Sequence, residues 1–358
     1  MNILGLDIGG ANTKSALIQF KKETISKSFT YIEYFPFWEK TVNDITQMFK
    51  RIEEELLIKN HFTLDIIDII SITITAELSD AFQTKREGII TILKALEQVF
   101  DKEKMFFINV DGIFLEFSEV LHNPHSIAAA NWVSTALFLG YYVSKAILID
   151  AGSTTIDIIP ILNSIPVNVG RNDVERIMYH ELIYTGGLRA TIPSITHFVP
   201  YKGKLIRISF EKFALVSDVH LILQNISEKE YINETADNRS KSLENCYARL
   251  SRIICMDIET ISKEELTTIA HYIYQKQLEL IKSEMQLFIK SLHKRLPEFK
   301  KSIPFIITGL SADFLIKKVL NELGYSQIKY YDEVTKIPEK ISSSAFAIAG
   351  AYYFQSIK

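Results

Sequence analysis

The order of apolar and polar residues along the chain predicts two similar α/β halves. In the first half, short runs of branched apolar residues indicate strands, and apolar residues spaced by three and four indicate helices. The predicted strands are residues 3–6, 15–20, 28–34, 66–75 and 105–110, and the predicted helices are 41–59, 85–100 and 126–142. Three strands, a helix, a strand and a helix in this order predict one α/β half-domain.

The same pattern restarts at residue 146. The predicted strands are 146–150, 156–161, 303–308 and two short strands within 201–210, and the predicted helices are 213–224, 241–255, 263–296, 312–323 and 342–354. The helix at 263–296 is long enough that we expect it to bend or break, and the small residues of the last helix suit a hinge. We therefore predict a first lobe at 1–144, joined by the C-terminal helix 342–356. The second lobe is predicted at 145–341, with an insertion at about 167–262.

A polar turn rich in glycine, residues 9–12, joins the first two predicted strands; we call it the first glycine turn. Gly9 and Gly10 have no Cβ, so the backbone can approach an anion closely and direct N–H groups at it. Asp7, at the end of the strand, is placed to hold Mg²⁺ directly or through water. The polar side chains predicted to contact phosphate are Asn12, Thr13 and Lys14. For this turn alone, an ordinary tight hairpin with an unrelated carboxylate is an equal alternative.

A second turn of the same kind, residues 152–155, follows the strand that ends in Asp150; we call it the second glycine turn. Its predicted phosphate-binding residues are Gly152, Ser153, Thr154 and Thr155, and Asp150 is its predicted Mg²⁺ ligand. The repeat favours a functional interpretation, because two such turns facing each other across a cleft could hold one phosphate chain from both sides.

Both turns resemble the phosphate loops of the actin-like superfamily of sugar kinases, actin and heat-shock chaperone ATPases. A closer resemblance covers nearly the whole chain and is to the hydantoinase A-like group associated with tetrahydromethanopterin-linked C1 transfer. Its motifs here are DIGGANTK (7–14), TAELSDAFQTKREG (75–88), NVDG (109–112), AAANW (128–132), IDAGSTTID (149–157), ELIYTGGLR (181–189), SDVHLIL (217–223) and TADNRSK (235–241). The resemblance implies an α/β, two-lobed actin-like (ribonuclease H-like) fold with an inserted segment in the second lobe.

The characterised members of this group are condensing synthases of methanofuran biosynthesis. The resemblance therefore implies a Mg²⁺-dependent transferase that joins the phenol of γ-glutamyltyramine to [5-(aminomethyl)furan-3-yl]methyl diphosphate, making an aryl ether and releasing pyrophosphate. Both turns and Mg²⁺ would stabilise the charge that develops on the departing pyrophosphate. Lys14 would act mainly in that transition state.

Candidate residues for proton transfer and substrate binding lie outside the two turns. Glu77, Asp111 and Asp157 are candidates for the base that takes the phenol proton. Glu77 and Asp80 follow a buried strand, where functional groups gather in α/β folds, and could bind an amine or a metal. The cations predicted to bind the glutamyl carboxylate are Lys85, Arg86 and Arg239. The alternative for residues 75–88 is a solvated loop that caps a helix.

Further predicted substrate-binding residues are Trp38, Arg189 and Asp237. Trp38 could stack on a flat ring, although such aromatics more often belong to the core. Asp237 and Arg239 could instead form a capping loop. Asp218 and His220 could be metal ligands, but a third ligand is missing, and we expect His220 to be a hydrogen-bonded structural residue.

Two other functions compete with the transferase: an ATP-dependent kinase or hydantoinase-like ATPase, and a nucleotide-binding regulator without turnover. Kinases of this superfamily usually carry a glycine pair that packs on adenine. The matching stretch, TGLSADFL at 308–315, has only Gly309, which we predict to contact the diphosphate. The missing glycine weakens an adenosine site and favours a substrate that carries its own diphosphate.

Composition narrows the classes of partner. The 358 residues are 47% hydrophobic and 23% charged, as in globular domains. A net charge of −3, without basic clusters, argues against nucleic-acid binding. We expect no signal peptide, because Asp7 interrupts the first apolar run, and no membrane span. Cys246 and Cys255 are expected to be free thiols in a reducing cytoplasm. The sequence leaves open whether the protein forms a homo-oligomer.

Overall fold

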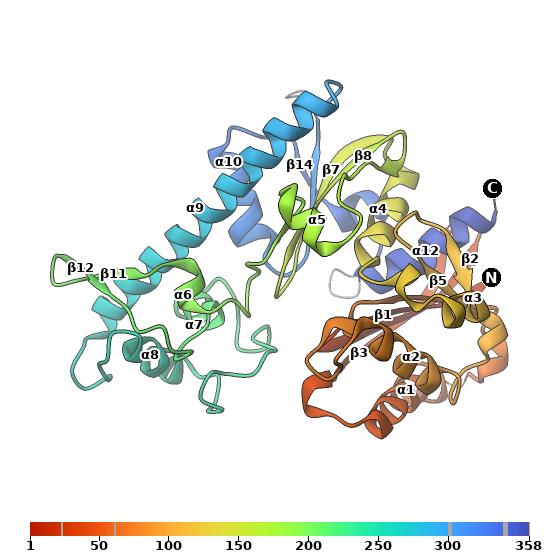
Figure 1. Ribbon diagram of the computed structural model, residues 1–358, viewed down its shortest axis with the longest axis horizontal. Coiled ribbons are helices and arrows are strands. Elements are labelled where there is room, and N and C mark those ends of the chain that lie inside the picture. Colours follow the sequence, from red (N-terminus) through yellow and green to blue (C-terminus); the bar gives the residue numbers. More distant parts are fainter. Residues whose placement is uncertain (23, 61, 300–302, 339–342, 358) are drawn as a thin grey trace. The chain divides into compact units, whose positions relative to one another are not determined.

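The computed structural model describes residues 1–22, 24–60, 62–299, 303–338 and 343–357 (Figure 1). The chain forms two compact units, each described here by itself. The first comprises Met1–Ala146, Ile159–Asp173 and Tyr331–Lys358, and the second comprises Ile147–Ile158 and Val174–Tyr330. The C-terminal helix therefore belongs to the same unit as the first strand.

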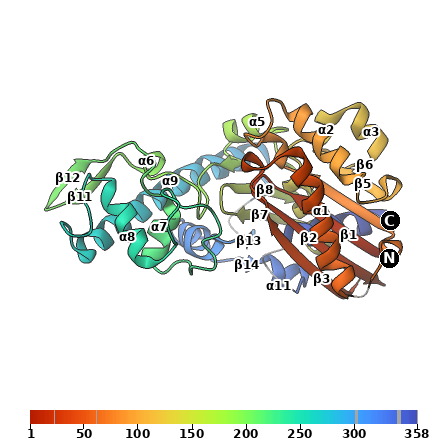
Figure 2. The ribbon, with the colours of Figure 1, turned by 90° about the horizontal axis from the view of Figure 1, so that it is seen from below.

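The first unit is built on a six-stranded sheet with the order β3-β2-β1-β4-β5-β6. Its strands are β1 (Asn2–Ile8), β2 (Asn12–Lys21), β3 (Thr24–Tyr34), β4 (Ile69–Ile74), β5 (Met105–Ile108) and β6 (Phe114–Glu116). Figure 2 shows β1, β2 and β3 side by side. β1 pairs antiparallel with β2 and parallel with β4, so that Asp7 lies opposite Lys14 on one side and Thr73 on the other. The end of β1 therefore brings three polar residues together.

Helices cover both faces of this sheet. α1 (Val42–Leu56) and α2 (Lys85–Leu96) join a core with Leu4, Leu6 and Ile8, which point to one face of β1. On the other face, Gly5 lies so close to α12 (Ser343–Ser356) that a Cβ would be 2.1 Å from the carbonyl oxygen of Ala345. The remaining elements of this unit are α3 (Phe117–His122), α4 (Asn131–Tyr142), β9 (Ile165–Pro166), α11 (Tyr331–Thr335) and short 3-10 helices at Phe37–Glu39, Ile58–Asn60, Leu64–Ile66, Ala76–Leu78, Lys102–Lys104 and Pro124–Ile127.

The second sheet has the order β10-β8-β7-β13-β14, in which β7 lies between β8 and the parallel strand β13, as β1 lies between β2 and the parallel strand β4. Its strands are β7 (Lys145–Ala151), β8 (Ile156–Leu162), β10 (Leu182–Ile183), β13 (Phe305–Thr308) and β14 (Ile328–Tyr330). The other elements are α5 (Asp173–Met178), α6 (Ile192–Ile195), β11 (Phe198–Tyr201), β12 (Lys204–Arg207), α7 (Val216–Ile222), α8 (Leu243–Arg252), α9 (Lys263–Arg295), a π-helix at Ala312–Lys317 and α10 (Lys318–Glu322).

Helix α9 is continuous over 33 residues, so it does not break, and the alternative expectation of a bend stays a prediction. Its start is stabilised by a capping box in which Ser262 and Glu265 bond to each other's backbone N–H groups. Apolar positions keep helical spacing along its whole length, because one side of α9 is buried from end to end. The buried stripe comprises Leu266, Ile269, Ile273, Gln277, Ile281, Met285, Phe288 and Leu292.

Three other predicted helices differ from the structure. Ala129 has a left-handed φ of 53°, which separates a 3-10 helix from α4 inside the stretch predicted as one helix. α8 ends at Arg252, so Cys246 and Cys255 are not on one helix, although both are free thiols. The helix predicted at 312–323 is π-helical in its first six residues. Short elements such as α5, α6, α11 and β14 were not predicted.

Candidate functional site

The first glycine turn follows the end of β1, where Asp7 is nearly buried. The Ser344 hydroxyl, at the start of α12, donates a hydrogen bond to the Asp7 carboxylate. The Lys14 ammonium lies 4.0 Å from Asp7 and 3.4 Å from Ser344 Oγ, and its side chain is one-third exposed. Asp7, Lys14 and Ser344 therefore form one charged group at the strand end, and part of the Lys14 side chain stays accessible.

The backbone of this turn has a fixed pattern of hydrogen bonds. Gly9 donates its N–H to Asn12 O at 3.1 Å, and the carbonyls of Gly10 and Ala11 accept from Phe37 and Phe35 at 3.1 and 2.8 Å. Within the described part of the chain, the N–H groups of Gly10 and Ala11 have no acceptor. In this turn the carbonyls are already bonded within the protein, while two successive N–H groups have no acceptor among the described residues. Such successive N–H groups suit the binding of an anion.

The second glycine turn has the same pattern, supplied by a different segment. Gly152 donates its N–H to Thr155 O at 2.9 Å. The carbonyls of the turn accept N–H groups from the segment that starts with Thr185–Gly186–Gly187, which we call the TGG loop: Gly187 bonds Gly152 O at 3.0 Å, Leu188 bonds Ser153 O at 3.0 Å, and Gly186 bonds Thr154 O at 2.9 Å. Among the residues that the structure describes, no acceptor is found for the N–H groups of Ser153 and Thr154.

Sequence reasoning included the TGG loop in a family motif but missed what it contacts. A Cβ on Gly186 would lie 2.6 Å from Gly152 O and Thr154 N, so the two backbones touch and only glycine has room. The adjacent glycines in YTGGLR were the available signal, since a glycine pair marks close backbone approach. The predicted Arg189 side chain is exposed, while its N–H bonds Ser153 O at 3.1 Å.

Gly309 and Ser311 support the same turn from the end of β13. Gly309 has a φ of 92°, and a Cβ there would lie 2.3 Å from Ala151 O and 2.8 Å from Asp150 Oδ1. The Ser311 hydroxyl donates to Ala151 O at 3.0 Å. Gly309 therefore allows the chain after β13 to pack against the end of β7, and its contact with a diphosphate stays a prediction.

Glu77 is the most unusual of the predicted catalytic residues. It is 2% exposed, and its Oε1 accepts the N–H of Ala129 at 3.1 Å. Its Oε2 is buried and has no hydrogen-bond partner among the described residues. Burial raises the pKa of Glu77 to about 7, against the opposing effects of Lys85 and the Ala129 N–H. A carboxyl that changes its charge near neutral pH suits proton transfer.

The segment that carries Glu77 lies beside the first glycine turn. Thr75 donates its N–H to Ile8 O at 2.9 Å, and its hydroxyl is 3.8 Å from the position of a Cβ on Gly9. Ser79 Cβ lies 3.8 Å from the same position on Gly10. Two family motifs treated separately in the sequence, at 75–88 and 128–132, therefore meet at Glu77, next to the predicted phosphate-binding turn.

The other two candidate bases are engaged with arginines. Asp157 forms a 2.8 Å ion pair with Arg176, whose side chain is buried. Asp111 pairs with Arg171, and both side chains are about half exposed. Because these carboxylates already have cationic partners, Glu77 is the best placed of the three to accept a proton.

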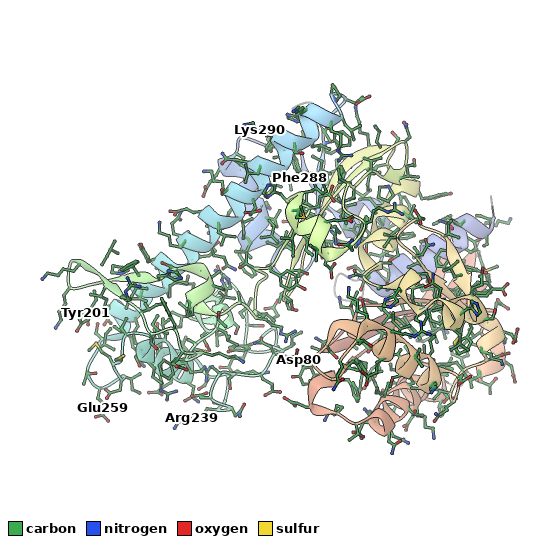
Figure 3. The ribbon with its side chains drawn as sticks, in the orientation of Figure 1. Asp80, Tyr201, Arg239, Glu259, Phe288 and Lys290 are labelled. Carbon is green, nitrogen blue, oxygen red and sulfur yellow. The ribbon has the colours of Figure 1, made fainter. Side chains whose placement is uncertain are left out.

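Asp237 and Arg239 differ in their surroundings. Asp237 accepts hydrogen bonds from Arg249 at 3.1 Å and Arg252 at 2.8 Å, so both of its oxygens are used within the protein. Arg249 is buried and also pairs with Asp218 at 2.8 Å. Arg239 is exposed (Figure 3). Its guanidinium lies 3.9 Å from Asp237. The alternative of a structural loop therefore describes Asp237 better than substrate binding does, because arginines from α8 hold it.

Of the remaining predicted substrate-binding residues, three lie at or shortly before the start of α2. Asp80, labelled in Figure 3, and Arg86 are exposed, while Lys85 is partly buried. Thr84 caps α2 by accepting the N–H of Glu87. The side chain of Trp38 lies outside the described residues. The binding roles of these side chains stay predictions.

Asp7 and Asp150, the predicted magnesium ligands, are single carboxylates at the ends of their strands. Among the described residues, no cluster of three or more Asp, Glu, His or Cys side chains forms a metal centre. Mg²⁺ commonly keeps several waters and uses one or two carboxylates together with substrate phosphates. Asp7, beside N–H groups suited to phosphate, therefore fits a metal held jointly with a ligand, and Asp150 occupies the corresponding place at the end of β7.

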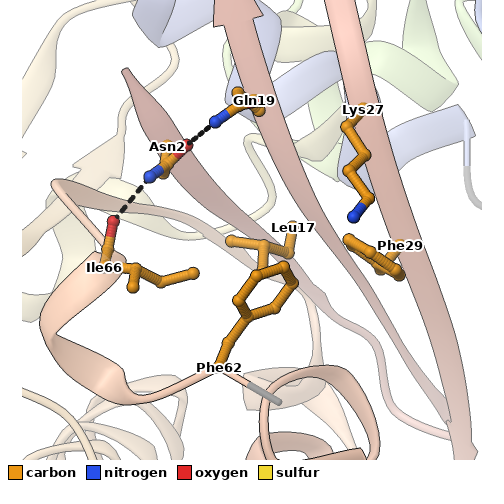
Figure 4. Close-up of a pocket in the computed structure, with 7 residues that line it drawn as sticks. All are labelled: Asn2, Leu17, Gln19, Lys27, Phe29, Phe62 and Ile66. Carbon is orange, nitrogen blue, oxygen red and sulfur yellow. Dashed lines mark hydrogen bonds between the residues drawn. The ribbon is translucent and has the colours of Figure 1, made fainter. Parts of the chain in front are cut away.

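A small pocket in the first unit lies apart from these residues. It is about 220 Å³ and is lined by Asn2, Leu17, Gln19, Lys27, Phe29, Phe62 and Ile66 (Figure 4). Lys27 Nζ lies 4.8 Å from the centre of the Phe29 ring. The pocket contains none of the predicted site residues.

Among the described residues, no helix is both long enough and apolar enough to cross a membrane.

The fold and the two turns define the class of this protein: a two-sheet α/β protein of the actin-like kind, as predicted. A nucleotide-free structure of acetone carboxylase has this fold, with a TM-score of 0.53, 10% identity and coverage of 98% of this chain and 70% of that one. The chain belongs to the hydantoinase/oxoprolinase (hydantoinase A) family, whose model matches residues 68–355.

Two curated relatives carry the same name, (4-{4-[2-(gamma-L-glutamylamino)ethyl]phenoxymethyl}furan-2-yl)methanamine synthase. The protein from Methanocaldococcus jannaschii is 34% identical over 350 residues, which cover 97% of this chain and 96% of the relative. The protein from Methanococcus vannielii is 33% identical over 192 residues, which cover 53% of this chain and 82% of the relative.

Proposed function

We propose that the protein is a synthase of methanofuran biosynthesis. In its finer form, the proposal is a transferase that condenses [5-(aminomethyl)furan-3-yl]methyl diphosphate with γ-glutamyltyramine and releases pyrophosphate. The observation that carries it is the 34% identity to the Methanocaldococcus jannaschii synthase over almost the full length of both chains. An ether product with the name of that relative requires a phenol, a furanylmethyl group and a leaving group.

The two glycine turns support a diphosphate as that leaving group. Each turn has its carbonyls bonded within the protein and two successive N–H groups without an acceptor among the described residues. Such N–H groups stabilise negative charge without reorganising when the charge develops. Lys14 adds a cation beside the first turn, at 4.0 Å from Asp7.

Glu77 is the proposed base. In the reaction the phenol oxygen forms a bond to the furanylmethyl carbon, the bond from that carbon to the diphosphate oxygen breaks, and pyrophosphate leaves with the electron pair. The phenolic proton passes to the Glu77 carboxylate. The supporting observations are its burial, its oxygen without a partner among the described residues, and its place in the segment beside the first glycine turn.

Magnesium has a supporting role in the proposal. Asp7 and Asp150 are the residues that would hold it, and the ion would supply positive charge against the diphosphate oxygens. The protein's own contribution is to hold these carboxylates in place, as the Ser344 hydroxyl does for Asp7 and the packing of Gly309 does for Asp150.

Thermal-shift measurements with pyrophosphate, ADP and ATP, each with Mg²⁺, test the class of ligand. We expect pyrophosphate to stabilise the protein more than ATP does, since the adenine motif is incomplete. A ligand at ~100 times its Kd adds roughly 2.7 kcal/mol to the free energy of unfolding. Detection of the ether product by mass spectrometry, together with released pyrophosphate, then tests the reaction itself.

An ATP-dependent kinase or hydantoinase-like ATPase is the second candidate, because the matching family is described as hydantoinase/oxoprolinase. Equal or greater stabilisation by ATP, with an affinity that depends on adenine, together with ATP hydrolysis and no ether product, would favour this candidate over the synthase.

A further inference from the structure

A buried series of hydrogen bonds connects α7 and Asn225, which follows it, to the TGG loop within the second unit. Asn225 Nδ2 lies 3.1 Å from His220 Nδ1, and His220 Nε2 lies 3.0 Å from Gln277 Oε1. Gln277 Nε2 donates to Thr185 Oγ1 at 2.9 Å and to Gly186 O at 3.1 Å. His220, Gln277 and Thr185 are at most 2% exposed, so bulk solvent does not reach these groups.

The carbonyl of Gly186 fixes which group donates and which accepts in each of these hydrogen bonds. Gly186 O can only accept, so the Gln277 amide must present its NH₂ to the TGG loop and its oxygen to His220. His220 must then donate from Nε2 and accept at Nδ1 from the Asn225 NH₂. Burial lowers the pKa of His220 to about 3, which agrees with a neutral ring that carries its proton on Nε2.

This series of hydrogen bonds ends at Gly186, whose backbone contacts the second glycine turn. Gly186 O accepts from Gln277, while the N–H of Gly186 donates to Thr154 O at 2.9 Å. The ring of Phe314 packs against His220, with ring centres 4.6 Å apart. The same ring lies 3.1 Å from the position that a Cβ on Gly187 would occupy, so it also contacts the TGG loop. The TGG loop therefore has α9 and α7 on one side and the turn on the other.

A second set of contacts joins α7 to the same segment. Val216 donates its N–H to Ala190 O at 3.0 Å, and Ser217 donates to Leu188 O at 3.3 Å. Leu188 in turn donates to Ser153 O in the second glycine turn. Both ends of α7 are thus connected to the backbone behind the turn, one directly and one through His220 and Gln277.

We propose that Gln277 is a positioning residue for the second glycine turn: it holds the TGG loop against residues 152–155, and through His220 it makes the shape of that turn depend on α7. The inference deepens the proposed function, on which it rests for the identity of the ligand. Gln277 and His220 do not themselves contact the ligand. They fix the carbonyls of the turn, so that the N–H groups of Ser153 and Thr154 stay directed at a phosphate.

The test compares the full-length protein with Gln277→Met, which keeps the length of the side chain and removes its hydrogen bonds. Tyr247→Phe is the control. It removes the 2.9 Å hydrogen bond between the hydroxyls of Tyr247 and Thr267, which joins α8 to the same helix α9 nearer its N-terminal end. If Gln277→Met does not fold, Thr185→Val replaces it, because it removes one bond at the loop and leaves α9 unchanged.

Amide hydrogen exchange without ligand is the first measurement. We expect the peptide that covers residues 184–190 to exchange at least about tenfold faster in Gln277→Met than in the wild-type or Tyr247→Phe protein. Pyrophosphate affinity in the presence of Mg²⁺ is the second measurement, with an expected loss of about tenfold in Gln277→Met and no change in Tyr247→Phe.

Unchanged exchange of residues 184–190 in Gln277→Met would overturn the inference, and so would unchanged pyrophosphate affinity. An equal loss of affinity in both variants would also overturn it, since the effect would then be one of general stability. If the wild-type protein does not bind pyrophosphate, the proposed ligand is wrong, and the exchange measurement alone decides the role of Gln277.

Discussion

At the scale of single residues, Glu77 and Asp7 show how the first unit gives similar side chains different chemistry. Glu77 is buried with one oxygen that has no partner among the described residues, whereas Asp7 accepts a hydrogen bond from Ser344 and lies near an ammonium group. The sequence identified these carboxylates by motif, but their environments depend on residues more than fifty positions away, such as Ala129. Local patterns could therefore nominate them without ranking them.

Glu77→Gln is predicted to abolish ether formation without unfolding the protein. In the wild-type protein, kcat/KM should fall as the pH falls through about 7, because the base must be ionised and burial raises the pKa of Glu77 to about 7. Initial rates between about pH 5.5 and 8.5 check the profile. Retained activity in Glu77→Gln, or a profile that is flat through pH 7, would assign the proton transfer to another group.

Stability provides an independent measurement of the same residue. The pKa of Glu77 is raised from 4.5 when unfolded to about 7 when folded, so the folded state binds more protons between these values. The free energy of unfolding should therefore fall as the pH rises from about 4.5 to 7, by roughly 3 kcal/mol from this group. Urea titrations at about pH 5 and 8 should show Glu77→Gln to be less sensitive to pH than the wild-type protein.

Lys14→Met is predicted to lower kcat more than it raises KM. The charge on the leaving oxygens grows as the bond breaks, so the contact with Lys14 is strongest in the transition state. The Lys14 side chain is one-third exposed, so we expect a loss of about tenfold, below the roughly 10²–10³ of a desolvated contact. Unchanged kcat and kcat/KM would place Lys14 outside the site.

At the scale of elements, the sequence predicted most of what is locally encoded. Both glycine turns, the strands that lead into them and the helix stripes followed from residues near one another in the chain. The backbone segments that bond the turns did not, because Phe35 and Phe37, and the TGG loop, reach the turns only after folding. The same reason applies to Asp237, whose loop is organised by Arg249 and Arg252.

Gly186→Ala is predicted to destabilise the protein and to remove pyrophosphate binding, because the new Cβ would lie 2.6 Å from backbone atoms of the second glycine turn. Gly203→Ala is the matched control. Gly203 has a φ of 74°, and no described residue lies within 4 Å of a Cβ there, so its replacement should cost only about 1 kcal/mol of backbone strain. Urea unfolding and calorimetric titration check both variants, and equal effects would contradict the role given to the TGG loop.

At the scale of the whole molecule, the chain passes between its two units several times, and each unit carries one glycine turn. The sequence predicted this repetition because the strand, Asp and glycine pattern occurs twice. The element order around β1 and β7 confirms two sheets of the same construction. That both turns hold one diphosphate stays a prediction.

Hydrogen exchange with and without pyrophosphate and Mg²⁺ tests that prediction. We expect slower exchange in peptides covering both turns, residues 8–13 and 151–156, with one pyrophosphate bound per chain, because the N–H groups of both would gain acceptors. The peptide covering residues 198–207 serves as an internal control and should not change. Protection of one turn alone would show that the turns act separately.

Helix α12 has a consequence for how the protein is made. Its backbone lies against Gly5, and its Ser344 bonds Asp7, a residue 337 positions earlier in the chain. During synthesis, β1 leaves the ribosome with one face still uncovered, and it stays so until α12, more than three hundred residues later, has been translated. The first unit therefore completes its fold only after α12 has been translated. Until then, the apolar and polar groups under α12 are exposed to wrong partners, including other nascent chains.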